Sequence, residues 1–193
     1  MNAMKIAGML REKKISLLTA NDLRKLLWIR KDNTLYKLIE RLIYQGVLLR
    51  VSKGLFQFAF SQASDYQKAN TLYHPSYISL ETALNHYGIL DQVPYAITSM
   101  TVRKTRNVVA EDREFDYVHL SAKYFWGFRK EKDFLIALPE KALIDELYTM
   151  AKGIRHLDWA ALDLTRIKKD DVRKMAGKIS YKPLQNLMRR LKI

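Results

Sequence analysis

The sequence of 193 residues contains no cysteine, and this absence excludes several kinds of chemistry at once. Disulfide bonds, thiol catalysis, iron–sulfur clusters and the usual structural zinc sites all depend on cysteine side chains. Glycine is also scarce, with seven residues scattered along the chain. They form neither of the two common glycine-rich loops that hold nucleotide phosphates.

Long hydrophobic runs are missing as well. The longest apolar runs are far too short to cross a bilayer, and the Met-Asn-Ala-Met start has no apolar segment of a signal peptide. We therefore expect a soluble, cytoplasmic protein. The histidines share no metal-ligand spacing, so we expect no metal, no cofactor and no enzymatic activity. They are His74, His86, His119 and His156.

Positive charge is in large excess, with a formal net charge of +14. Such an excess favours a polyanionic partner, most simply nucleic acid, although a solvated basic surface is the plainer explanation. Residues 1–60 carry twelve Lys or Arg against four Asp or Glu, a net charge of +8. Residues 61–193 carry twenty-two against sixteen, a net charge of +6 over more than twice the length. The basic density is therefore N-terminal.

The N-terminal sixty residues predict three helices. The first covers residues 2–13. Thr19 is expected to cap a second helix over 20–27, and Asp32 to cap a third that runs to about Gln45. Hydrophobic residues of the third helix recur at the spacing of a buried stripe. They are Leu35, Leu38, Ile39, Leu42 and Ile43.

A short hairpin is predicted after the third helix. Residues 47–51 and 55–60 are rich in β-branched and aromatic types, and Ser52-Lys53-Gly54 lies between them as a turn. The alternating phenylalanines Phe56, Phe58 and Phe60 are expected to pack against the third helix. Three helices followed by a hairpin with a basic tip are typical of a winged helix-turn-helix.

The polar face of the third helix has the residue types that read DNA. An α-helix fits the major groove, where Asn binds adenine and Lys or Arg binds guanine or a phosphate. Basic residues just before the helix are suited to a backbone phosphate, and the hairpin lysine to the DNA backbone or minor groove. The candidate DNA-binding residues are Arg30, Lys31, Asn33, Thr34, Tyr36, Lys37, Arg41 and Lys53.

Any amphipathic helix carries polar residues outside, so this helix alone does not establish DNA binding. The hairpin shifts the balance towards double-stranded DNA. Winged helices also bind RNA or other proteins, and a protein-binding module that captures a partner directly is the alternative. Binding to single strands by base stacking would require exposed aromatic residues on a sheet.

We expect an α+β fold with two domains: a winged helix-turn-helix over 1–62, a connection over 63–75, and a mixed α/β domain over 76–193. Asp65 is expected to cap a short helix within the connection. This helix is expected to end at Leu72, before Pro75. In the second domain, Ser79 or Ser76 is expected to cap a helix. The patterns predict strands over 96–102, 107–110, 115–120 and 134–138, and helices that start at Pro139, at Asp170 or Asp171, and at Pro183.

A possible second basic patch contains Arg103, Lys104 and Arg106, close in sequence to the hydroxyl residues Thr98, Ser99, Thr101 and Thr105. It could extend a DNA footprint, or it could be an ordinary solvated loop. The charged residues after Pro139 are expected to form an exposed, salt-bridged helix face; they are Lys141, Asp145 and Glu146. The aromatic run 124–128 is expected in the core or at an interface.

Several stretches of the second domain resemble the second domain of AbiEi-type antitoxins. They are Tyr77-Ile78-Ser79-Leu80-Glu81-Thr82-Ala83-Leu84-Asn85-His86-Tyr87-Gly88, Ile97-Thr98-Ser99-Met100-Thr101 with Arg103-Lys104-Thr105-Arg106, and Ala137-Leu138-Pro139-Glu140-Lys141-Ala142-Leu143-Ile144-Asp145. The N-terminal Leu23-Arg24-Lys25-Leu26-Leu27, Thr34-Leu35-Tyr36 and Gly46-Val47-Leu48 are similar to the winged helix that precedes it in that family. The N-terminal motifs are shared by many winged helices, and the later ones are more specific.

The resemblance implies a transcriptional regulator from a bacterial type IV toxin–antitoxin or abortive-infection operon. Such regulators repress their own promoter by binding inverted repeats. For this chain we expect cooperative or dimeric assembly on the DNA. They oppose a nucleotidyltransferase toxin that is encoded beside them, generally without forming a stable complex with it. In that family the C-terminal domain is linked to antitoxicity.

Overall fold

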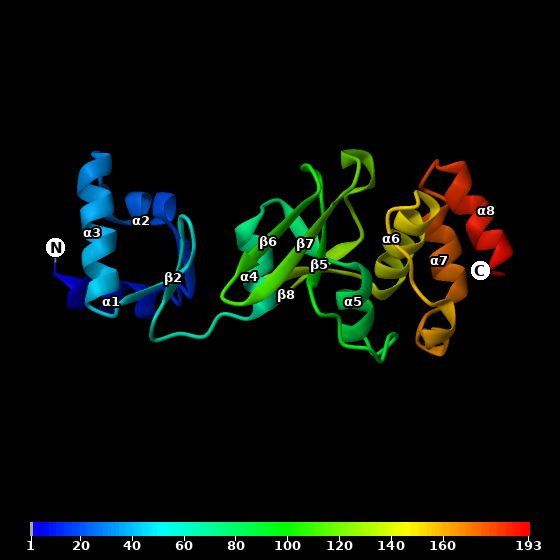
Figure 1. Ribbon diagram of the computed structural model, residues 1–193, viewed down its shortest axis with the longest axis horizontal. Coiled ribbons are helices and arrows are strands. Elements are labelled where there is room, and N and C mark those ends of the chain that lie inside the picture. Colours follow the sequence, from blue (N-terminus) through cyan, green and yellow to red (C-terminus); the bar gives the residue numbers. More distant parts are fainter. Residues whose placement is uncertain (1) are drawn as a thin grey trace. The chain divides into compact units, whose positions relative to one another are not determined.

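The computed structural model describes residues 2–193, and its fold is mixed α+β as expected. The chain divides into two compact units, Met1–Leu72 and Tyr73–Ile193. The division falls inside the segment 63–75 that the sequence suggests as a connection. Figure 1 shows the elements of both units. No helix within residues 2–193 is both long and apolar enough to cross a membrane.

The first unit contains three helices and a small antiparallel sheet, followed by one further helix. The sheet has the strand order β1-β3-β2. The elements are α1 (Ala3–Glu12), β1 (Leu17–Thr19), α2 (Ala20–Leu27), α3 (Asp32–Tyr44), β2 (Leu48–Ser52), β3 (Leu55–Phe58) and α4 (Asp65–Leu72). The three predicted helices and the hairpin are confirmed to within a few residues. The strand β1, which extends the hairpin into a three-stranded sheet, was not predicted.

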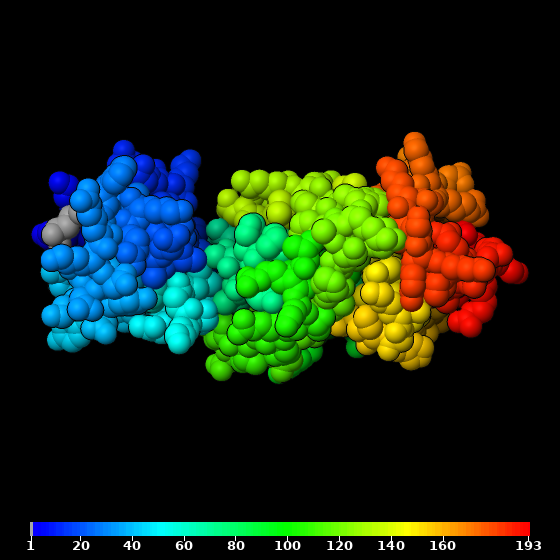
Figure 2. Space-filling view, turned by 90° about the horizontal axis from the view of Figure 1, so that it is seen from above, coloured from blue at the N-terminus to red at the C-terminus, as the bar shows by residue number. Residues whose placement is uncertain are grey.

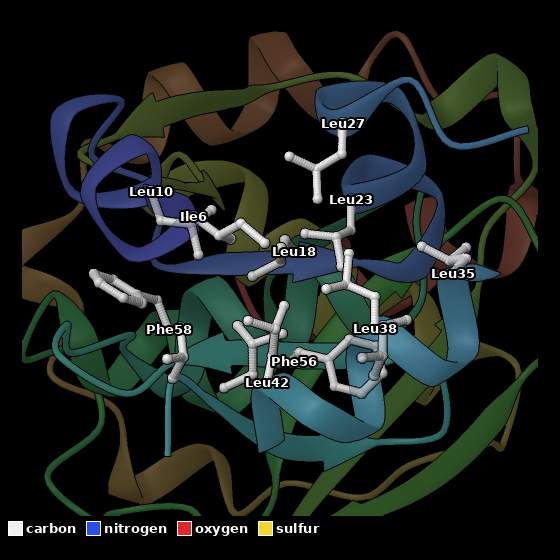
Figure 3. Packing of buried hydrophobic residues seen from close by; sticks show 13 residues of the cluster. Ile6, Leu10, Leu18, Leu23, Leu27, Leu35, Leu38, Leu42, Phe56 and Phe58 are labelled. Carbon is white, nitrogen blue, oxygen red and sulfur yellow. The ribbon is translucent and has the colours of Figure 1, made fainter. Parts of the chain in front are cut away.

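The core of this unit lies between the three helices and the sheet (Figure 3). Four residues of the predicted stripe of α3 are buried, and Phe56 and Phe58 of β3 belong to the same core. Phe60 does not: it lies beyond the end of β3 and is 64% exposed, so its expected packing role is wrong. The core residues are Ile6, Leu10, Leu18, Leu23, Leu27, Leu35, Leu38, Ile39, Leu42, Val47, Leu48, Phe56 and Phe58.

The helix starts show one predicted cap and two corrections. Thr19 caps α2 as expected, in a reciprocal capping box with Asp22. Asp32 does not cap α3, because it is already the first helical residue and its carboxylate pairs with the Arg24 guanidinium. The cap position belongs to Lys31, which makes no side-chain capping bond.

The start of α4 is the second correction. Asp65 is its first residue, and the hydroxyl of Ser64 accepts a hydrogen bond from the Gln67 backbone N–H at 3.2 Å. Ser64 therefore has the role of cap that the sequence suggested for Asp65, because both residue types can accept such a bond.

The second unit is built on a six-stranded mixed sheet with the order β6-β7-β5-β4-β9-β8. The pairs β5–β7 and β4–β9 are parallel, and the other neighbours are antiparallel. The strands are β4 (Ser76–Ile78), β5 (Ile97–Thr101), β6 (Arg106–Ala110), β7 (Arg113–His119), β8 (Phe128–Glu131) and β9 (Phe134–Ala137). β4 and β8 were not predicted.

Helices of the second unit pack on this sheet and on one another. α5 (Leu80–His86) and α6 (Pro139–Ala151) lie side by side against the sheet, and α7 (Lys169–Ala176) and α8 (Lys182–Arg190) lie against α6 (Figure 1). In the space-filling view the side chains of α7 and α8, orange to red, adjoin those of α6 in yellow (Figure 2). This arrangement encloses α6 between the sheet and the C-terminal helices, so most of its residues are buried.

Candidate functional site

The outward face of α3 presents the predicted DNA-binding side chains to solvent. Its core stripe points inward, so the remaining positions of the helix are exposed. Tyr36 is 56% exposed, and Lys37 has no ion-pair partner among residues 2–193. The structure therefore leaves the side chains of Tyr36 and Lys37 available for a ligand. The exposed candidates on this helix are Asn33, Thr34, Tyr36, Lys37 and Arg41.

One side chain of α2 contacts both the turn before α3 and the start of α3. Arg24 of α2 pairs with Asp32 at the start of α3, and its guanidinium also donates a hydrogen bond to the Arg30 carbonyl at 3.4 Å. Arg30 and Lys31 are both exposed beside this ion pair. The two cations are thus attached to a defined turn and lie next to the uncapped start of α3.

The hairpin between β2 and β3 turns where the sequence predicts. Gly54 has a φ of +83°, a left-handed conformation that favours glycine, and Lys53 beside it is exposed. The pairing of β2 with β3 is irregular between Arg50 and Ser52, just before the turn. Lys53 is therefore presented to solvent at the tip of a short two-stranded ribbon.

Two neighbouring residues of the turn were missed by the sequence analysis. Trp28 has a left-handed φ of +54° and is 90% exposed, which is unusual for so large an apolar side chain. Ile29 lines a hollow of about 420 Å³ together with four residues of α3. A tryptophan and an isoleucine within a four-residue turn were the only sequence signals of this feature. The residues of α3 that line the hollow are Thr34, Lys37, Leu38 and Arg41.

In the possible second basic patch the charged residues are exposed, whereas three of the four hydroxyl residues are buried. Arg103, Lys104 and Arg106 are exposed, and the guanidiniums of Arg103 and Arg106 lie 4.5 and 5.6 Å from the centre of the Tyr73 ring. Thr98, Ser99 and Thr101 are at most 1% exposed, because β5 is buried along its whole length. These three hydroxyl groups cannot reach a phosphate, so the candidate patch keeps the three cations and the exposed Thr105, whose hydroxyl accepts a hydrogen bond from the His119 backbone N–H at 3.0 Å.

The prediction that the charged residues of α6 form an exposed face is wrong. Lys141, Asp145 and Glu146 are all fully buried. Lys141 pairs with Asp145, and its ammonium also donates a hydrogen bond to the Tyr77 hydroxyl at 2.9 Å. The other Asp145 oxygen accepts hydrogen bonds from the hydroxyls of Tyr77 and Ser79, each at 2.8 Å. We call these four residues, Lys141, Asp145, Tyr77 and Ser79, the ionic cluster.

Aromatic residues and one glycine enclose the ionic cluster. The Lys141 ammonium lies 5.4 Å from the centres of the Tyr77 and Trp126 rings. Gly127 has a φ of +78°, and a Cβ atom there would lie 2.9 Å from the Lys141 side chain, so only glycine fits. Burial raises the pKa of the Tyr77 phenol well above its ordinary value, and the neighbouring Asp145 carboxylate raises it further. Tyr77 therefore stays protonated and remains a donor to Asp145.

Glu146 is buried on the same helix, but its carboxyl group lacks the partners that Asp145 has. Neither of its carboxylate oxygens has a hydrogen-bond partner among residues 2–193. Burial raises its pKa to about 8, and the negative charge of Glu81 adds to the effect, while the Arg155 guanidinium opposes it. That guanidinium is held by Glu81 through two hydrogen bonds of 2.7 and 2.8 Å. Glu146 is thus a carboxyl group that is kept largely protonated at neutral pH.

Metal ligands are not gathered anywhere in residues 2–193, where no group of three or more His, Asp or Glu side chains could hold an ion. No protein-family model matches this sequence, and no curated protein matches it. Among solved structures, the chain is similar to the RV2827C protein from Mycobacterium tuberculosis. The two are 18% identical with a TM-score of 0.56, and the match covers 96% of this chain and 70% of the other. At this identity the likeness concerns the fold alone.

The ionic cluster predicts a strong and coupled effect of substitution on stability. Removing one charge of a fully buried pair leaves the other uncompensated, so Lys141→Met or Asp145→Leu should each lower the free energy of unfolding by about 3–5 kcal/mol. The double variant should lose much less than the sum, because no unpaired charge remains. Urea denaturation measures all three. A double variant that loses the full sum would contradict the coupling.

A matched control for this experiment is the exposed pair of Asp170 and Arg173 on α7, whose atoms lie 2.9 Å apart. Exposed pairs contribute little, so Asp170→Ala should change the free energy of unfolding by about 0.5 kcal/mol or less.

Glu146 predicts a pH dependence of stability. In the unfolded chain its carboxyl loses a proton near its ordinary pKa of 4.5, whereas in the folded chain it keeps the proton up to about pH 8. This group therefore lowers the stability of the folded chain as pH rises from about 4.5 to 8. Glu146→Gln, which cannot ionise, should be more stable than the wild type at pH 9, and its advantage should shrink towards pH 5. Thermal unfolding at several pH values measures this, with Glu140→Gln as the control for loss of one acidic group from α6. An advantage that is equal at both pH values would refute the assignment.

Proposed function

We propose that the chain is a DNA-binding transcriptional regulator and that its N-terminal unit is a winged helix-turn-helix. The observation that carries the proposal is the exposed polar face of α3, whose opposite side is anchored in the core. A helix used to read a groove must be held rigidly while its donors and cations face outward. The β2–β3 hairpin with Lys53 at its tip follows α3 directly and supplies the wing.

Each candidate residue has a role in this proposal. Asn33, Lys37 and Arg41 contact base edges or phosphates from α3, and Thr34 and Tyr36 contact the backbone or thymine. Arg30 and Lys31 bind a phosphate at the start of the helix. Lys53 lies along the backbone or in the minor groove. The exposed cations Arg103, Lys104 and Arg106 of the second unit extend the phosphate contacts.

The target and the biological role follow from the resemblance to AbiEi-type antitoxins. We infer that the DNA is the promoter of the protein's own operon, with inverted repeats bound cooperatively or by a dimer. The protein acts as the antitoxin of a type IV toxin–antitoxin or abortive-infection system and opposes a nucleotidyltransferase toxin. The second unit carries the antitoxicity, without a stable complex between the two proteins.

The alternative is a module that captures a toxin or another protein directly. The exposed large apolar side chains of the first unit favour it, since such residues often mark protein-binding surfaces. Trp28 is 90% exposed and Tyr44 is 92% exposed. Trp28 lies in the turn before α3 and Tyr44 is the last residue of α3. A protein bound to these residues would therefore compete with DNA for α3.

DNA binding predicts a specific loss on substitution of the helix face. Lys37→Ala and Arg41→Ala should each weaken binding to the protein's own promoter by about 1–3 kcal/mol, provided that the side chain contacts a base. Fluorescence anisotropy with a labelled promoter duplex at fixed salt measures the affinity, and scrambled DNA measures the non-specific part. Lys5→Ala on α1 removes the same charge from an exposed position outside the turn, helix and hairpin and is the matched control. Unchanged affinity in both helix variants would remove α3 from the proposed interface.

The division of labour between the units gives a second prediction. The double variant Lys37→Ala with Arg41→Ala should lose promoter repression but still protect cells that co-express the toxin, because antitoxicity is assigned to the second unit. A reporter fused to the promoter and a growth assay measure the two properties separately. Loss of protection together with a stoichiometric toxin complex that survives high salt would favour the direct-capture alternative.

A further inference from the structure

The hollow beside α3 has an apolar floor and a basic rim. Its volume is about 420 Å³. Leu38, which is 9% exposed, and the half-buried Ile29 supply the apolar surface. Thr34, Lys37 and Arg41 line the same hollow and are exposed. The site therefore offers apolar contact and positive charge within the same small surface.

The hollow is preformed because both of its walls are anchored. Thr34, Lys37, Leu38 and Arg41 follow one another along one flank of α3 at the spacing of helical turns. Ile29 belongs to the turn that Arg24 contacts through Asp32 and the Arg30 carbonyl. The backbone N–H of Ile29 also donates to the Arg24 carbonyl at 3.1 Å. The backbone on both sides of the hollow would then lose little conformational entropy when a ligand enters.

The chemistry of the hollow suits one feature of duplex DNA. In the major groove the C5-methyl group of thymine is the apolar group by which a T·A pair differs from the others, and it lies among polar base edges and near anionic phosphates. An apolar floor would bury the methyl group while Lys37 and Arg41 bind the surrounding oxygens. An aliphatic side chain of a protein would fill the floor but would offer no anionic group to Lys37.

We propose that this hollow is a thymine-reading subsite, in which Ile29, Leu38 and the methyl group of Thr34 contact the C5-methyl group of one thymine in each bound site. The inference rests on the proposed DNA-binding function and adds to it a base preference at a defined position. Ile29 and Leu38, which carry no hydrogen-bonding side chain, then become specificity-determining residues.

The test removes the methyl group alone. Duplexes that the wild-type protein binds most tightly are selected from random DNA, and each thymine is replaced in turn by deoxyuridine. At one thymine in each site, affinity should fall about three- to fivefold, which corresponds to the burial of one methyl group. The other replacements should have no effect.

Two protein variants assign that loss to the hollow. Ile29→Ala should bind thymine and deoxyuridine duplexes with nearly equal affinity at the sensitive position. Thr34→Ser, which keeps the hydroxyl and loses only a methyl group, should reduce the discrimination and serves as a variant with little risk of misfolding. Lys5→Ala should retain the full discrimination of the wild type.

The failures of the two proposals are distinguishable. Tight selection of duplex DNA with no deoxyuridine effect at any position, or with an effect that Ile29→Ala leaves intact, would overturn the thymine subsite and leave DNA binding in place. No selected duplex at all would overturn the DNA-binding function and the subsite with it. Binding of a protein partner to the hollow, without any selected duplex, would overturn both proposals and favour the capture alternative.

Discussion

Burial of one stripe of α3 is the constraint on which the first unit depends. Leu35, Leu38, Ile39 and Leu42 pack into a core shared with α1, α2 and the sheet, and this fixes the rotation of the helix about its axis. Because 3.6 residues make one turn, fixing the inner face also fixes the outer one. The positions of Asn33, Lys37 and Arg41 follow from the leucines beneath them. The Arg24–Asp32 ion pair adds only local order at the helix start, since exposed ion pairs contribute little energy.

The second unit depends on a buried ion pair whose charged groups are hydrogen-bonded to neighbouring hydroxyls. Lys141 and Asp145 have lost all contact with water, a loss that only mutual pairing and the Tyr77 and Ser79 hydroxyls offset. Since Tyr77 and Ser79 belong to the β4–α5 segment and the two charges to α6, the cluster joins segments that are distant in sequence. Glu146, one residue further along, has no such partners and is neutralised by its raised pKa. Of these two neighbouring buried carboxyl groups, Asp145 is therefore charged and paired, whereas Glu146 is kept neutral.

The sequence predicted several features that neighbouring residues determine. The stripe of α3, the Thr19 cap and the Gly54 turn depend on residues within a few positions of one another, and the sequence shows them. The strands β1 and β4 have three residues each and exist because they pair with distant strands, so no local pattern reveals them. The spacing of Lys141 and Asp145 is the same for an exposed pair as for a buried one. Their neighbours Ala142, Leu143, Ile144 and Leu147 were the available signal, because a helix apolar on every side is a buried helix.

Most motif residues of the second unit that resemble the antitoxin family are buried, and this limits the roles that their side chains can have. The buried ones are Tyr77, Ile78, Ser79, Leu80, Thr82, Ala83, Leu84, Ile97, Thr98, Ser99, Met100, Thr101, Ala137, Lys141, Ala142, Leu143, Ile144 and Asp145. Thr98 bonds to Thr82 and to the Ser79 carbonyl, and the ionic cluster joins the remaining motif. These motifs therefore specify how the unit is packed, and none of these buried side chains can touch a toxin or a nucleic acid without local opening. A partner of this unit, as proposed, would have to bind side chains that the packing leaves outside. Exposed residues of the same motifs are His86, Arg103, Lys104, Thr105 and Arg106.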